Sequence, residues 1–121
     1  MIDYSKIDSN CIEFVEFFNS IGLTTSQSCE GHISRSMYSY YIQFDKSVSD
    51  SDIENFILKF EQPLYAKNKI KGKFVKIHFG FIDGKSVSAW RYWCNISCDY
   101  KMNQFFAKED LIIFKDKFNY I

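Results

Sequence analysis

The chain has 121 residues, of which 46% are hydrophobic and 19% aromatic, and its fifteen basic residues balance fifteen acidic ones. This length predicts one domain over residues 1–121, with a buried core built largely on rings. The zero net charge excludes a global field that would attract a long nucleic acid or a membrane surface. No signal peptide or membrane-length apolar run is evident, so we expect a cytoplasmic protein with reduced cysteines.

The first part of the chain predicts a helix followed by two strands. Apolar residues recur at helical spacing over residues 10–21, and Gly22 follows where a left-handed residue commonly ends a helix. Residues 23–28 favour a short strand. After a loop, residues 37–44 carry ring and aliphatic side chains at alternate positions, which predicts a strand with one buried face.

The second part of the chain predicts a further helix, a hairpin and a last helix. Capping residues at 49–52 precede an apolar stripe that stops at Pro63, and another strand is predicted near residues 64–70. The Asp83-Gly84 pair is typical of a type I′ hairpin turn. With a final helix over about 104–118, we expect an α+β fold in the order α-β-β-α-β-β-α. Its single antiparallel sheet would have four to five strands, with helices packed on one face.

The predicted hairpin would place charge and rings on the sheet face away from the helices. A two-residue turn pairs Lys76 with Arg91 and Phe74 with Trp93, with His78 on the same face. Two opposed cations cost roughly 0.2–1 kcal/mol relative to neutral pairs, a cost that an anion between them would offset. Rings that stack on a base beside cations that hold phosphate indicate a nucleotide site. The same residues also suit an ordinary solvated face or a dimer interface.

Residues 28–32 read SCEGH and place a thiol, a carboxylate and an imidazole in one short stretch. Cys29 and His32 are half of a zinc ligand set, but Cys94 and Cys98 would lie about 13 Å apart on a straight strand and do not complete it. The same pair could act as nucleophile and base in a hydrolase, although no third member is recognisable. A purely structural turn, with Gly31 at positive φ, is a third interpretation. A loop that holds a ligand is the fourth and our leading one.

The stretch FNSIGLTTSQSCEGHIS resembles a signature of small bacterial and phage proteins, in which a first helix precedes G-I-x-T-x-x-S-C-x-G-H. More distantly it is similar to the wybutosine-synthesis methyltransferase family, where a comparable helix precedes T-S-S-C-S-G-R-I. This chain has His32 where that family has Arg. The resemblance implies a pocket around Ser28, Cys29, Gly31 and His32 that receives a nucleoside-type group.

The leading hypothesis is a small nucleotide-binding protein, encoded by a phage, that sequesters a host immune signalling nucleotide without turning it over. The alternatives are a nucleoside- or RNA-modifying enzyme, a Cys-His hydrolase, and a protein interaction module whose aromatic sheet face pairs with itself, as a homo-oligomer, or with a host protein. We predict no catalytic residue, metal or cofactor. The predicted ligand-binding residues are Thr25, Ser26, Ser28, Cys29, Glu30, Gly31, His32, Arg35, Lys76, His78, Arg91 and Trp93.

Overall fold

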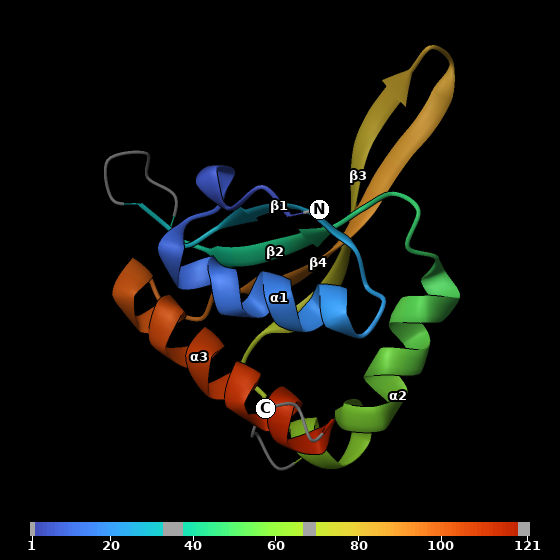
Figure 1. Ribbon diagram of the computed structural model, residues 1–121. Helices are drawn as coiled ribbons and strands as arrows, with labels where there is room; N and C mark the ends of the chain where they lie inside the picture. The colour runs from blue at the N-terminus through green and yellow to red at the C-terminus, as the bar shows by residue number, and fades with distance from the viewer. Residues whose placement is uncertain (1, 33–37, 67–69, 119–121) are drawn as a thin grey trace.

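The computed structural model describes residues 2–32, 38–66 and 70–118, and it confirms the predicted α+β class (Figure 1). Two 3-10 turns, η1 (Tyr4–Lys6) and η2 (Ser9–Cys11), open the chain. The elements that follow are α1 (Ile12–Ser20), β1 (Thr25–Cys29), β2 (Tyr40–Phe44), α2 (Asp50–Ala66), β3 (Lys73–Ile82), β4 (Lys85–Cys94) and α3 (Tyr100–Lys117). The strands form one antiparallel sheet in the order β1-β2-β4-β3.

Apart from shifts of up to three residues at the ends of α1, β1 and β2, two predicted elements differ from the structure. Helix α2 continues past Pro63 to Ala66, so a strand over residues 64–66 was a wrong prediction; the remaining positions 67–69 lie outside the described residues. Proline removes one backbone donor and disfavours the helix at the residue before it, but the residues after it can stay helical. Helix α3 begins at Tyr100, earlier than predicted, because the Asp99 carboxylate accepts a hydrogen bond from the Lys101 N–H at 2.9 Å and caps the first turn.

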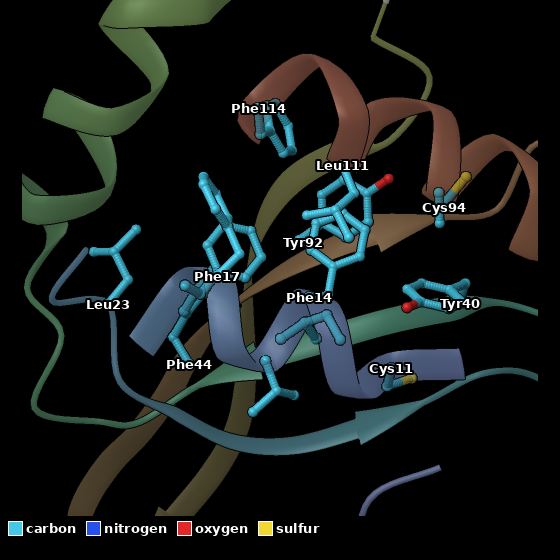
Figure 2. Packing of buried hydrophobic residues seen from close by; sticks show 14 of the residues in the cluster. Cys11, Phe14, Phe17, Leu23, Tyr40, Phe44, Tyr92, Cys94, Leu111 and Phe114 are labelled. Atoms are coloured by element: carbon cyan, nitrogen blue, oxygen red, sulfur yellow. The ribbon is translucent and has the colours of Figure 1, made fainter. Parts of the chain in front are cut away.

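Ring packing fills the layer between the sheet and the helices (Figure 2). The Phe14 ring of α1 lies 4.7 Å from the Tyr92 ring of β4, and Phe114 of α3 lies 6.1 Å from the same ring, measured between centroids. On β2, Tyr40 and Phe44 are fully buried, as the alternate spacing predicted. The helices therefore cover one face of the sheet and leave the other, which we call the open face, to carry a site.

The hairpin turn forms as predicted, but the register does not continue along it. Asp83 and Gly84 have φ of 51° and 77°, as a type I′ turn requires. The predicted pairing holds from the turn as far as Gly80, which lies opposite Val87. One extra residue, Phe79, then forms a β-bulge, and Gly80 supplies the positive φ of 110° there.

The bulge makes the predicted pairing of Lys76 with Arg91 wrong. Beyond it, Lys76 lies opposite Trp90, and Phe74 lies opposite Tyr92 rather than Trp93. A shift of one residue moves every following side chain of β3 to the other face of the sheet, because strand side chains alternate. Phe74 therefore joins the core, and Lys76 leaves the face that holds Arg91.

Asp110 is a buried carboxylate that joins α3 to the chain before β3. It accepts hydrogen bonds from the backbone N–H groups of Lys71 at 2.8 Å and Gly72 at 2.7 Å, and from the Tyr92 hydroxyl at 2.6 Å. Burial raises the pKa of this carboxyl, while the three hydrogen bonds oppose that rise. Because all three partners donate a hydrogen bond, both side-chain oxygens of residue 110 must act as acceptors.

The Asp110→Asn variant tests this requirement, because its amide NH₂ must face at least one N–H or O–H donor. We expect a loss of about 1–3 kcal/mol in the free energy of unfolding, measured by denaturant titration. Asp116→Asn, an exposed change on the same helix, is the control and should stay within about 0.5 kcal/mol of the parent. Equal stability of the two variants would show that the buried carboxylate is dispensable.

Candidate functional site

The open face carries adjoining rows of side chains that cross the sheet, because paired residues of neighbouring antiparallel strands project to the same side. One row consists of Cys29, Tyr41, Trp93 and Lys73. The next row consists of Gln27, Gln43, Arg91 and Val75. Cys29, Arg91 and Trp93 therefore project to the same face of the sheet.

Arg91 is the oriented cation of this surface. Its guanidinium carbon lies 4.0 Å from the centroid of the Tyr41 ring and 5.7 Å from that of Phe79. Its Nε donates a hydrogen bond to Gln43 Oε1 at 2.8 Å. Within the described ranges, no carboxylate forms an ion pair with Arg91. Rings and an amide thus hold the side chain in place while its charge stays available to an anion.

A hollow of about 300 Å³ opens beside this row, between the ends of β1 and β2 and the projecting part of the hairpin. Gln43 and Phe79, which contact Arg91, also line the hollow. Ala89 forms part of its floor. Its volume lies at the lower end of the range for small-molecule sites, roughly 300–1,000 Å³.

The hydroxyl residues of β1 border a second hollow, also of about 300 Å³, between β1, α1 and the N-terminal segment. Thr25, Ser26 and Ser28 all line it, and Ser26 lines both hollows. Ser28 pairs with the buried Ile42, so its side chain lies on the helix side of the sheet rather than on the open face. Thr25 pairs with the buried Phe44 and so also lies on the helix side, and of the three hydroxyl residues only Ser26 borders the first hollow as well.

Residues 28–32, which we call the SCEGH turn, bring the Cys29 thiol and the His32 imidazole close to Asp8, which lies far away in the sequence. Gly31 has a φ of 90° and donates its N–H to Cys29 Sγ at 3.4 Å. His32 Nε2 lies 3.2 Å from Asp8 Oδ2, and the donor atoms of Asp8, Cys29 and His32 all lie within 4.8 Å of one another. No pattern in the sequence links Asp8 to the turn, so sequence reasoning missed it.

The side chain of Glu30, unlike those of Cys29 and His32, forms hydrogen bonds that attach the SCEGH turn to other elements of the fold. Its carboxylate accepts hydrogen bonds from Asn10 Nδ2 at 2.6 Å and Gln104 Nε2 at 3.2 Å, and its N–H donates to Asp8 Oδ2 at 3.1 Å. These bonds connect the turn to η2 and to α3. Glu30 therefore fixes the position of the turn, and its carboxylate is already engaged.

Besides the β1 hydroxyl residues, the structure places Lys76 and His78 on the helix side of the sheet, away from the open-face rows, which corrects their predicted position. Lys76 forms an ion pair with Asp50 at 2.9 Å, beside Trp90, whose indole N–H also donates to Asp50 at 2.7 Å. These two hydrogen bonds hold the pKa of Asp50 below its ordinary value. His78 lies on the same side of β3 as Lys76 and bonds Ser86 at 2.8 Å. A third predicted residue, Arg35, lies outside the described residues.

Comparison of the chain with protein-family models, with curated proteins and with solved structures gives no match. In the part of the chain that the structure describes, no helix has the length and apolar character needed to cross a membrane.

Thiol reactivity should separate the structural cysteines from the exposed one. Burial raises the pKa of Cys11 and of Cys94 from 9.0 to about 12. At pH 8 the reactive thiolate would then be about one part in ten thousand at either residue. With iodoacetamide on the folded protein, peptide mass spectrometry should find label on the exposed Cys98 but none on Cys11 or Cys94.

The denatured protein is the control, because all four cysteines are free and should then take up label. Labelling of Cys11 or Cys94 in the folded protein at the rate of Cys98 would contradict the burial of these thiols.

Proposed function

We propose that this protein binds a nucleotide on the open face of its sheet and holds it without turning it over. The observation that carries the proposal is the Arg91 guanidinium, oriented by Tyr41 and Gln43 and without a carboxylate partner in the described ranges. A planar guanidinium with free N–H groups matches the oxygens of a phosphate, and such charge-assisted hydrogen bonds are stronger than neutral ones.

The neighbouring rings support recognition of a base. Trp93 lies on the same face as Arg91 at the next outward position of β4, about 7 Å along the strand. It is half-buried, so its ring is supported by the sheet but still reachable. One nucleotide can therefore contact the indole with its base and the guanidinium with its phosphate, while the hollow bordered by Gln43 receives the rest.

The surroundings of Arg91 support binding rather than catalysis. Its neighbours in the row are the amides of Gln27 and Gln43 and the aliphatic Val75, and none of these groups takes or gives a proton near neutral pH. Burial raises the pKa of Tyr41 despite the nearby Arg91, so the phenol also stays protonated. A protein that captures a signalling nucleotide and returns it unchanged, as a phage sequestering protein would, suits this chemistry.

A comparison of Arg91→Ala with Lys76→Ala tests the site. Calorimetric titration with a panel of linear and cyclic adenine and guanine nucleotides should identify a ligand of the parent protein. Arg91→Ala should weaken its binding by at least about tenfold, since a hydrogen bond to a charged group contributes about 1.5–3 kcal/mol. Lys76→Ala should change affinity less than about twofold, because Lys76 is paired with Asp50 on the other face.

The fate of the ligand is the second measurement. After incubation and heat denaturation of the protein, chromatography should recover the nucleotide unchanged. Equal loss of affinity in the two alanine variants would contradict the assignment of Arg91 to the site. Conversion of the nucleotide would contradict sequestration and support the enzyme alternatives.

A further inference from the structure

Asp8, Cys29 and His32 form a second cluster of chemically active side chains, at the edge of the sheet where the N-terminal segment meets the end of β1. We propose that these three side chains bind a zinc ion. The inference is independent of nucleotide binding, because it involves neither Arg91 nor Trp93 and is tested with the metal alone. It differs from the sequence prediction of no metal, which considered Cys94 and Cys98 as partners and had no reason to consider Asp8.

The spacing of the donor atoms suits a tetrahedral ion. Bonds of about 2.0–2.1 Å to oxygen and nitrogen at a tetrahedral angle place the two donor atoms about 3.3 Å apart. Asp8 Oδ2 and His32 Nε2 lie 3.2 Å apart, and the Cys29 donor lies within 4.8 Å of both. Bonds of about 2.3 Å to sulfur and about 2.0 Å to nitrogen at a tetrahedral angle would bring the Cys29 sulfur to roughly 3.5 Å from the other two donor atoms.

Backbone groups already orient two of the three ligands. The Glu30 N–H donates to Asp8 Oδ2 at 3.1 Å, and the Gly31 N–H donates to Cys29 Sγ at 3.4 Å. Hydrogen bonds of this kind to a ligating carboxylate and thiolate are the usual outer shell of a metal site, where they fix the orientation of the ligands. Between Cys29 and His32, Gly31 adopts a positive φ of 90°, a conformation that glycine takes readily.

The ligand types select the metal. Thiolate and imidazole are unsuited to Mg²⁺ and Ca²⁺, which prefer oxygen, whereas Zn²⁺ accepts sulfur, nitrogen and carboxylate oxygen together. Three protein ligands leave a fourth position for water. The side chains of His32 and Asp8 are 34% and 33% exposed, so water can reach this position.

Two other uses of the cluster fit less well. As a nucleophile, Cys29 would need to contact a substrate carbonyl, but only 6% of the residue is exposed. The nearby Gly31 N–H donates to the Cys29 sulfur, so it is not available to stabilise an oxyanion. A simple hydrogen bond between His32 and Asp8 would account for the distance between these two side chains. It would not account for the Cys29 thiol lying close to both of them. A small ion needs less access than a substrate and uses all three groups.

Metal titration tests the proposal directly. With Co²⁺ as a spectroscopic substitute, the parent protein should bind one ion per chain. It should show a thiolate-to-metal charge-transfer band in the ultraviolet and the intense visible bands of tetrahedral Co²⁺. Competition against a chromogenic chelator should then measure the Zn²⁺ affinity. Cys29→Ser should abolish the charge-transfer band, and Asp8→Asn should weaken Zn²⁺ binding by at least about tenfold.

Asp8→Asn guards against a folding artefact, because its amide oxygen can still accept the Glu30 N–H and circular dichroism can verify the fold. Cys98→Ser, at an exposed cysteine, is the matched control and should leave the band and the affinity unchanged. Absence of the charge-transfer band in the parent protein, or the same Zn²⁺ affinity in the parent, Cys29→Ser and Asp8→Asn, would overturn the proposal. So would a change in the cobalt spectrum caused by Cys98→Ser.

Discussion

The bulge at Phe79 decides which side chains of the hairpin meet the core and which meet the open face. Near the turn, β3 and β4 pair in the register that Asp83-Gly84 sets, but the extra residue changes the side to which every earlier residue of β3 projects. Phe74 consequently packs among the rings of α1, α2 and α3 instead of lying exposed beside Trp93. The ring-rich core and the polarity of the open face both depend on this one inserted residue.

The same shift separates the two cations that seemed to belong together. Lys76 meets Asp50 at the start of α2, so its charge is matched within the fold. Arg91 stays on the open face, where a ring and an amide orient it without neutralising it. Among the described residues Arg91 has no ion-pair partner, and the planar donors of a guanidinium define a direction, which a pair of opposed cations would not.

The N-terminal segment contributes the other chemical feature of the molecule. The carboxylate of Asp8 lies against the SCEGH turn because the Glu30 N–H binds it, while the carboxylate of Glu30 is held by Asn10 and Gln104. The turn is thereby connected to both η2 and α3. This support makes residues 29–32 a fixed constellation, which is the condition that either a ligand site or a metal site requires.

Local patterns in the sequence determined the elements: helical spacing over residues 10–21, alternation in β2, and a type I′ turn at Asp83-Gly84. They also placed Arg91 and Trp93 on one face, because side chains alternate regularly along β4. Gly80 was the one local signal of the bulge, since an isolated glycine within a strand often marks one.

Only the tertiary structure decided the contacts between distant segments. Asp8 and Asp110 look like ordinary surface carboxylates in the sequence, yet one lies beside the SCEGH turn and the other is buried under Tyr92. Asn103 is likewise fully buried, where it binds the carbonyl oxygens of Tyr38 and Ser97. The partners of such groups are chosen by how the helices and the N-terminal segment pack on the sheet. Periodicity cannot reveal them, because it records which face of an element is apolar and not which distant residue will meet it.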